Sequence, residues 1–455
     1  MSVKTGHDQV AFFSLESSYG VATDPSETGA LRFSEFVITP NEERISRQDR
    51  RPGSRSAEAM IRGKRNIEAT LVAEDCPSGT AGTSPDLDEL LQTTYDKVSF
   101  TPSTTVEASP TPTTSGCTVA DAAGLATGSI IGVPALDEAG VAVVFAVRVE
   151  TVVGAAITWT PELPSAPAAG ATIGARVEYV LAVDNQNSAT AYKYYGTDFV
   201  ECLAGAVATS WEYEIEAGGV VSASATVAAK DVARFQPMAL AAACTQSQTE
   251  IVVSDLTSDV YSAGRCVFQL GAEQVAVTAV DEDNTSVTIE RGVNGTSAAA
   301  HDQDDEMTPV RPDPTFYGAP IAGILGRIAI GGTYYHITGA RIVHRENSNL
   351  RNEQFGSATA VGKLNAAPRE VSVELNGYLI ANEDRWQLAH GIVQTAVLIQ
   401  AGTQAGGIHA FALPKVEFDL PAIEGNADEE VPLQLTGTAM APYGDPESEL
   451  THAYL

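Results

Sequence analysis

Apolar and polar residues alternate along two stretches of the chain, residues 64–74 and 368–378, that are far apart in the sequence. Successive side chains of a β-strand point to opposite faces, so this period of two predicts strands with one buried face. The buried positions are predicted to be Ile67, Ala69 and Leu71 in the first stretch and Val371, Val373 and Leu375 in the second. Gly53-Ser54 and Gly356-Ser357 lie upstream at matching distances, so each stretch is predicted to belong to a long hairpin with a polar tip.

A second pair of stretches, residues 211–216 and 416–420, alternates apolar with acidic residues, and a return strand is predicted after each. The apolar members are predicted to pack together: Trp211, Tyr213, Ile215, Val416, Phe418 and Leu420. The acidic members are then predicted to share the opposite face: Glu212, Glu214, Glu216, Glu417 and Asp419. A solvated, half-exposed sheet would produce the same pattern, so the alternation alone assigns no role to these acids.

A helix is expected between the two hairpins in each region. Ser84 is suited to cap a helix over residues 84–95, and Asn382 is suited to cap a weaker one over residues 382–391, which Gly391 would end. The chain is therefore predicted to contain the same unit twice, as long hairpin, helix and hairpin. The first unit covers residues 1–115 with 181–244, and the second covers residues 312–455.

Two further segments, residues 116–180 and 245–311, interrupt these units and resemble each other. Each follows the order strand, loop, apolar strand, strand, turn, strand and loop, and each is predicted to be a small β-barrel-like module. The first module is inserted within the first unit, and the second lies between the two units. Asn294-Gly295 in the second module favours a tight hairpin turn, since both residues tolerate positive φ. The fold class is thus mainly β.

Composition is consistent with this fold class and limits the function. With 455 residues, 44% apolar and 19% charged, the chain is long enough for roughly three domains. Its five cysteines are widely spaced without a CxxC pair, which favours neither a zinc ribbon nor a disulfide framework. The N-terminal stretch has no signal-peptide pattern, and no apolar run is long enough to cross a membrane, so neither standard export nor membrane insertion is expected.

The formal net charge is −31, so most of the surface is expected to repel nucleic acid. Basic residues are nevertheless concentrated in residues 44–65, which are either a solvated loop or a contact arm for an acidic neighbour. The residues of this predicted interface arm are Arg44, Arg47, Arg50, Arg51 and Arg55.

No catalytic, metal-binding or cofactor-binding motif is evident. The sequence contains no HExxH, GxSxG or P-loop pattern, and we expect neither an enzyme nor a bound cofactor. His301 precedes Asp302, Asp304 and Asp305, where a solvated acidic loop is favoured over a divalent-ion site. His336 and His344 lie in strand-like stretches, which favours packing or solvent contact for both.

Four stretches together resemble the major tail tube protein of long-tailed bacterial or archaeal viruses. They are "FFSLESSYGVATDP", "GAVATSWEYEIEAGGVVSASATVAAKD", "ARIVHRENSNLRNEQFGSATAVGKLNAAPREVSVELNGYL" and "FALPKVEFDLPAI". The second module, ending "ERGVNGTSAAAH", is similar to small β-domains that recur on viral structural proteins. The resemblance implies rings of hairpin-helix-hairpin units that form an inner β-barrel and stack around the tape measure protein and, later, the DNA.

Geometry then suggests the number of chains. Single-unit relatives close as six units, and about 24 strands, tilted ~40°, give a backbone diameter of roughly 48 Å. A two-unit chain is therefore expected to form a homotrimer with pseudo-sixfold symmetry, with a homohexamer as the second choice. The predicted acids would line the lumen, where they would let DNA pass without binding it.

The remaining expectations follow from the same resemblance. The protein would be assembled in the host cytoplasm, reside in the virion tail, and contact the tail terminator and the distal tail or baseplate proteins. The alternative is a β-rich adhesin or carbohydrate-binding virion protein whose two modules are the recognition domains.

Overall fold

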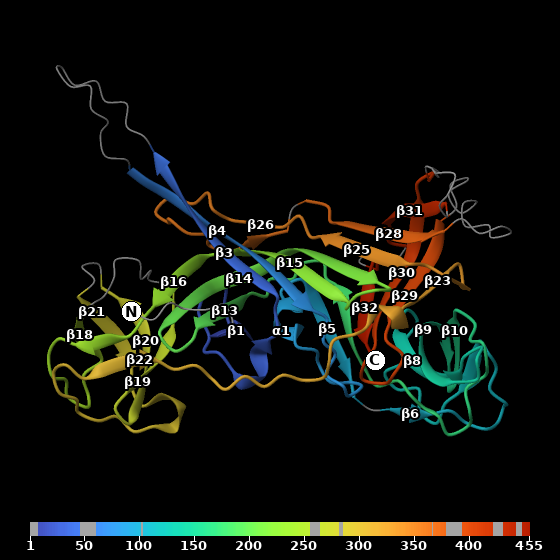
Figure 1. Ribbon diagram of the computed structural model, residues 1–455, viewed down its shortest axis with the longest axis horizontal. Coiled ribbons are helices and arrows are strands. Elements are labelled where there is room, and N and C mark those ends of the chain that lie inside the picture. The colour runs from blue at the N-terminus through green and yellow to red at the C-terminus, as the bar shows by residue number, and fades with distance from the viewer. Residues whose placement is uncertain are drawn as a thin grey trace, which may run out of the picture.

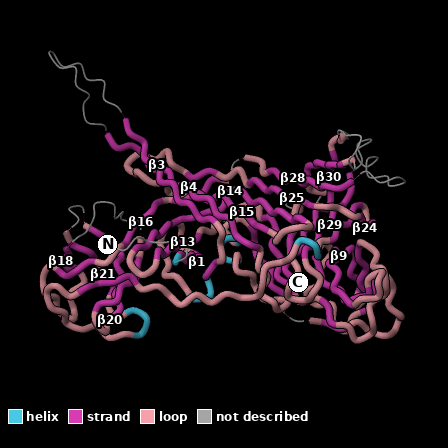
Figure 2. Tube along the Cα trace, in the orientation of Figure 1, coloured by secondary structure: helices cyan, strands magenta, loops and turns pink. Residues whose placement is uncertain are grey.

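Strands dominate the computed structural model, which describes residues 8–45, 61–101, 103–254, 264–281, 285–365, 367–378, 394–421, 431–442 and 448–455. Figure 2 shows strands and loops almost throughout, with a few short helical turns. The predicted mainly β class is therefore confirmed.

Eight antiparallel strands form a continuous inner sheet along one side of the molecule (Figure 1). In order of pairing they are β3 (Glu35–Ile45), β4 (Ile61–Glu74), β15 (Ser222–Ala229), β14 (Phe199–Glu216), β25 (Gly339–Arg345), β28 (Glu370–Tyr378), β31 (Pro432–Ala439) and β30 (His409–Phe418). The described strands leave this sheet open as a half-barrel.

A second, outer layer covers one face of the inner sheet. The part of this layer that is joined to β14 contains β1 (Gln9–Leu15), β2 (Ala30–Leu31), β13 (Ala189–Tyr195) and β16 (Asp231–Phe235). The part that is joined to β30 contains β23 (Arg327–Ile330), β24 (Thr333–Tyr335), β29 (Gln394–Ala401), β32 (Thr451–Tyr454), β12 (Arg176–Leu181) and β5 (Tyr95–Phe100). The long strands β14 and β30 pair in both layers.

The same set of strand pairings occurs twice along the chain. In the first half, β1 pairs with β2 and β13, β14 pairs with β13, β15 and β16, and β4 pairs with β15 and β3. In the second half, the corresponding pairings join β23 to β24 and β29, β30 to β29, β31 and β32, and β28 to β31 and β25. The halves meet where β14 pairs with β25.

The main core lies between the two layers and is filled by complementary volumes. On β14 and β15, Trp211 and Tyr213 lie opposite Ala225 and Ala223, and all four are buried. In the second half, β31 instead supplies the larger Leu433 and Leu435. Burying each large side chain stabilises the fold by roughly 1.5–3 kcal/mol. The large side chains come from β14 in the first half and from β31 in the second, so the two halves fill the core from different strands.

The first predicted helix is much shorter than expected. The helix α1 covers only Asp88–Leu91, and Ser84 does not cap it. The Thr93 hydroxyl donates to the Leu90 carbonyl, and Tyr95 already begins β5, where pairing with β12 replaces helical hydrogen bonds. The second predicted helix, residues 382–391, lies outside the described residues.

The second module (module 2), predicted as a small β-barrel-like module, is a closed barrel of six strands. Its strands, in barrel order, are β17 (Met238–Leu240), β18 (Glu250–Ser254), β21 (Ser286–Glu290), β20 (Glu273–Val280), β19 (Cys266–Leu270) and β22 (Glu306–Pro309). The barrel thus begins a few residues before residue 245, where the module was predicted to start.

The first module (module 1, predicted over residues 116–180) differs from the expected barrel-like fold. Its described strands form a four-stranded sheet of β7 (Gly116–Thr118), β10 (Ala156–Thr160), β9 (Ala142–Val153) and β8 (Ile130–Leu136), beside the pair β6 (Thr104–Thr105) and β11 (Thr172–Ile173). The preceding residues 104–107 join the module, whereas β12 belongs to the outer layer. Three 3-10 turns (Glu27–Gly29, Val293–Gly295 and Gly323–Leu325) and the pair β26 (Asn349–Leu350) and β27 (Lys363–Leu364) complete the fold.

The two modules lie at opposite ends of the molecule, below the inner sheet in the view of Figure 1. Module 2 packs on the first half through residues that include Phe12, Tyr192 and Tyr194. Module 1 packs on the second half through Leu398 and small residues of β23, β29 and β30, among them Ala412. Each module therefore contacts the outer layer on the side away from the inner sheet.

Candidate functional site: an acidic face of the inner sheet

The predicted acids of β14 lie on the open face of the inner sheet. Glu214 and Glu216 are exposed and Glu212 is partly exposed, whereas the intervening Trp211 and Tyr213 are buried in the core. Strand alternation explains this arrangement, because the odd positions of β14 face the outer layer. On β30, Glu417 is partly exposed between the buried Val416 and Phe418, and Asp419 follows the strand and is exposed.

The strand register brings further acids to the same face that sequence reasoning did not single out. Pairing across the sheet places them on the same face as the predicted residues, one or more strands away: Glu35, Glu68, Glu74, Glu370 and Glu374. Glu68, Glu74, Glu370 and Glu374 occupy the polar positions of the alternating stretches at 64–74 and 368–378, so that alternation could have identified them.

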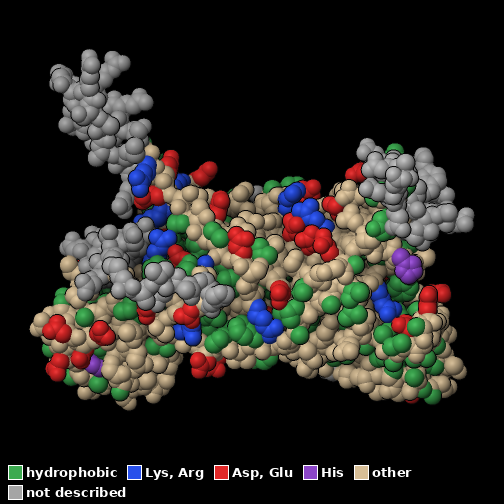
Figure 3. All heavy atoms as spheres, in the orientation of Figure 1, with side chains coloured by type: hydrophobic (Ala, Val, Ile, Leu, Met, Phe, Trp, Pro, Cys, Tyr) green, Lys and Arg blue, Asp and Glu red, His purple; other side chains and the backbone are tan. Residues whose placement is uncertain are grey.

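Two arginines on β25 interrupt the acidic face. Arg341 Nε lies 2.6 Å from Glu212 Oε1, and its Nη1 lies 3.8 Å from Glu374 Oε2. Arg345 Nη1 lies 3.4 Å from Glu370 Oε2. The hydrogen bond to Glu212 raises the pKa of Arg341. Figure 3 shows acidic and basic side chains together near β25, so the acids outnumber but do not exclude bases on this face.

The second acidic stretch does not align with the first as the sequence suggested. The sequence matched Trp211 to Val416. The pairings of β14 with β13 and β15, compared with those of β30 with β29 and β31, instead match Ala206 to Val416 and Trp211 to Leu420. The expected packing of Leu420 is therefore wrong, because its side chain is 69% exposed whereas that of Trp211 is 1% exposed. A register shift between Ala208 and Ser210 on β14 contributes to the offset.

The predicted basic arm lies largely outside the described residues. Arg44 is exposed on β3, in the hairpin that projects from the body at the upper left of Figure 1. Arg47, Arg50, Arg51 and Arg55 are outside the described residues. The neighbouring Arg65 turns back to the body, where Nη1 lies 3.3 Å from Asp231 Oδ2.

A buried polar cluster connects the two halves in the core. Asp75 accepts hydrogen bonds from the Tyr454 hydroxyl at 2.8 Å and interacts with His409 Nδ1 at 2.6 Å. His409 Nε2 lies 2.9 Å from His452 Nδ1. Burial, and then the neighbouring His409 and His344, lower the pKa of His452 well below its usual value. Since all these side chains are buried, the cluster joins strands of the core and is inaccessible to a substrate.

His301 does not lie in a solvated loop as the sequence suggested. It is buried, and Nε2 lies 2.9 Å from Glu273 Oε2. Arg291 contacts both oxygens of Glu273 at 3.0 and 2.6 Å. Burial alone would raise the pKa of Glu273, but these hydrogen bonds and one from the Ala299 N–H lower it to about 2. The arrangement fixes the loop to the barrel and explains His301 without a metal ion.

Asn294-Gly295 forms a turn, but it is not the predicted hairpin. Asn294 and Gly295 have positive φ of 54° and 77°, as expected for this dipeptide. The turn is a 3-10 turn that leads into a long loop before β22, and β21 and β22 are not neighbours in the barrel. His336 is exposed after β24, whereas His344 is buried on β25 with Nδ1 2.7 Å from the Tyr95 hydroxyl.

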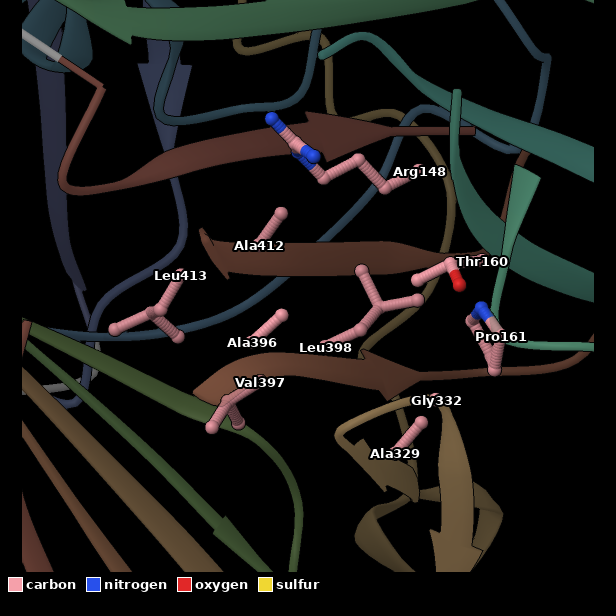
Figure 4. Close-up of a pocket in the computed structure, with 10 residues that line it drawn as sticks. All are labelled: Arg148, Thr160, Pro161, Ala329, Gly332, Ala396, Val397, Leu398, Ala412 and Leu413. Carbon is pink, nitrogen blue, oxygen red and sulfur yellow. The ribbon is translucent and has the colours of Figure 1, made fainter. Parts of the chain in front are cut away.

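Two cavities lie where module 1 meets the second half. The first, of about 10 Å³, is lined by Arg148, Thr160 and Pro161 of the module and by β23, β29 and β30 (Figure 4). It is large enough for about one water molecule, so it is a packing defect rather than a ligand site. The second is an open groove of about 440 Å³, whose lining includes Phe145 and Tyr335.

Within the described residues, no group of three or more His, Cys, Asp or Glu side chains is arranged to hold a metal ion. The described part of the chain also contains no helix that is long and apolar enough to cross a membrane. Among the described residues, the broadest feature available for function is the acidic face of the inner sheet. No protein-family model matches this chain, and no curated protein matches it in sequence.

Proposed function

We propose that this protein is a structural component of a viral tail tube, in which each chain contributes two successive arcs of a hollow β-walled cylinder. The observation that carries the proposal is the repeated pairing order, which gives two four-stranded arcs joined edge to edge at β14 and β25. Each arc supplies four strands, so three chains supply the 24 strands of a tube with a diameter of roughly 48 Å. A stacked homotrimer therefore fits better than a homohexamer.

In this tube the acidic face of the inner sheet lines the lumen. The open face carries the acids from both halves, while the modules occupy the other side of the molecule (Figure 1). Carboxylates facing DNA phosphates do not form ion pairs, so DNA moves through the lumen without being held. The role is structural rather than catalytic, with the tape measure protein, the tail terminator and the distal tail or baseplate proteins as partners in the virion tail.

Electron microscopy and native mass spectrometry of the purified chain test the assembly. We expect rings or tubes with a central channel and a ring mass of three chains. A population of monomers at all concentrations and salt conditions would contradict the proposal.

The lumen assignment has a separate test that uses a matched charge change. Replacing Glu212, Glu214 and Glu216 by Lys is expected to make assembled tubes bind duplex DNA at low salt, as measured by fluorescence anisotropy. The control changes three exposed acids in or beside module 1, Glu107, Glu138 and Glu162, to Lys. Equal DNA binding by both variants would show that β14 does not face the lumen.

The groove beside module 1 favours the alternative of a carbohydrate-binding virion protein. The partly exposed ring of Tyr335 and the acid Asp137 line it, and such a combination suits sugar rings and hydroxyls. Specific binding to a glycan array by a protein that forms no rings would support this alternative over the tube.

A further inference from the structure

The junction between the two halves shows which strand edges pair. Among the described residues, the corresponding edges at the ends of the inner sheet, along β3 and at residues 419–421 after β30, have no strand partner. Inside the chain, residues 210–216 of β14 pair antiparallel with residues 339–345 of β25. Repeated pairings make β30 the counterpart of β14 and β3 the counterpart of β25. Among the described strands of the inner sheet, β3 pairs with β4 alone, and its other edge is open.

The register of the junction can be transferred residue by residue. The pairings of β15 with β14 and of β31 with β30 make Ala225 and Leu435 corresponding residues. Leu71 pairs with Ala225 and Leu375 pairs with Leu435, so Leu71 and Leu375 also occupy corresponding positions. Their partners on the next strand, Phe36 and Ala340, correspond in turn. The sequence alignment of residues 64–74 with 368–378 gives the same correspondence independently.

Burial differs between the junction and the open ends in the way that a missing neighbour would produce. Within the chain Trp211 lies opposite His344, and the side chains are 1% and 0% exposed. Their counterparts are Leu420, which is 69% exposed, and Pro40, which is also exposed. An exposed edge strand with apolar side chains is a template for pairing with another chain.

We propose that the open edge of β3 pairs antiparallel with the segment at the end of β30 in a second copy of this chain. The register places Asn41 opposite Asp419, Pro40 opposite Leu420 and Thr39 opposite Pro421, as Arg345, His344 and Val343 lie opposite Ser210, Trp211 and Glu212 within one chain. The contact is head-to-tail, because two different edges meet, so it builds rings or filaments. This inference rests on the proposed assembly and adds its residue contacts.

Disulfide cross-linking between two single-cysteine variants tests the register. Asn41→Cys and Asp419→Cys are mixed, oxidised and analysed by mass spectrometry, and we expect a cross-linked dimer that neither variant forms alone. Both sites are exposed, and the five native cysteines are buried, so background cross-linking should be low. Ser210→Cys with Arg345→Cys in one chain is the positive control, since these residues already pair.

Val37→Cys mixed with Asp419→Cys is the control for register. It moves the thiol four residues along β3, about 13 Å from the proposed partner, so it should give little cross-link. Equal cross-linking at Val37 and Asn41, or none at Asn41 while the internal control forms, would overturn the proposed pairing.

The outcomes separate this inference from the tube itself. Hollow rings without the Asn41–Asp419 cross-link would leave the tube proposal standing and show that other edges close the ring. A cross-link in open filaments or isolated dimers would support the pairing and contradict the closed tube. If Pro40 instead protects the edge against pairing, the mixed Asn41→Cys and Asp419→Cys variants should stay monomeric and form no cross-link between chains. That outcome would contradict both the edge pairing and the tube.

Discussion

Tyr194 and Gln400 occupy corresponding positions on β13 and β29, and each anchors a module in a different way. The Tyr194 hydroxyl donates to the Val310 carbonyl beside module 2 at 3.1 Å. The Gln400 side chain accepts from the Ala146 N–H of module 1 at 2.7 Å and donates to the Val144 carbonyl at 2.8 Å.

The apolar residues around Tyr194 and around Gln400 also differ in kind. Module 2 is held by aromatic rings, with Phe235 of the outer layer and Phe268 of the barrel in an edge-to-face contact at 6.0 Å between centroids, in a cluster that includes Phe12 and Tyr194. Module 1 is held by small residues, including Ala329, Ala410 and Ala412. Hydrogen bonds hold both modules, since Arg265 of module 2 donates to both carboxylate oxygens of Asp24 at 2.7 and 2.8 Å, so the corresponding surfaces differ mainly in the size of their apolar side chains.

The largest expected effect comes from removing an aromatic contact of module 2. Phe12→Ala should lower the free energy of unfolding by about 3–5 kcal/mol, because the ring is fully buried. Leu398→Ala, the matched change on the module 1 side, should cost less, toward the low end of about 2–5 kcal/mol. Urea unfolding measures both, and a larger loss for Leu398 would contradict the comparison.

The second-largest expected effect is a loss of stability of module 2 at low pH. The pKa of Glu273 is lowered from 4.5 to about 2 in the folded state, so its stabilisation is present above pH 4.5 and lost as the pH falls toward 2. The loss should be on the order of 3 kcal/mol. Hydrogen exchange of residues 273–280 compared with residues 142–153 measures it, and Glu273→Gln should remove most of this pH dependence. Equal acid sensitivity in both modules would count against the mechanism.

Removing the anchor of module 1 should have a smaller effect. Gln400→Leu removes the hydrogen bonds to the Ala146 N–H and the Val144 carbonyl, each with a net contribution of about 0.5–1.5 kcal/mol, so the total loss should be about 1–3 kcal/mol. Tyr194→Phe removes one hydrogen bond and should cost about 0.5–1.5 kcal/mol. Faster hydrogen exchange at residues 142–148 in the Gln400 variant alone is the expected signature. The same exchange rate in both variants would show that Gln400 does not anchor the module.

The smallest effect is expected on the opposite face, away from both modules. Arg341→Ala breaks partly exposed ion pairs with Glu212 and Glu374 and should change stability by less than about 1 kcal/mol. Thermal unfolding at low and high salt measures it. A larger loss would mean that the acids of the inner sheet depend on Arg341 to remain close together.

The sequence predicted the features that depend on local periodicity. Alternation along residues 64–74 and 211–216 identified the buried and exposed faces of β4 and β14, because strand side chains alternate whatever their neighbours are. The same signal could not place Leu420, because the register shift on β14 and the lack of a described strand on the far side of residue 420 are properties of pairing. Ser84 suggested a helix over residues 84–95, but pairing of Tyr95 with β12 ended it early.

Contacts between distant segments were beyond the sequence pattern. Module 1 is inserted within the first half of the chain but packs on the second, through Ile130 and Leu398 among others. Likewise, His301 followed by acids suggested a solvated loop, whereas Glu273 and Arg291 come from other parts of the module to bury it. Neither partner is marked by local spacing, so only the folded chain reveals them.

The 18 residues of β14 have a mechanical consequence, because one uninterrupted backbone serves both layers. Fully extended, the strand is about 60 Å long. Its first part is hydrogen-bonded to β13 and β16, and its last part to β15 and β25. A sideways load on module 2 is thus carried to the inner sheet by covalent bonds, and the two layers resist shear as a single plate.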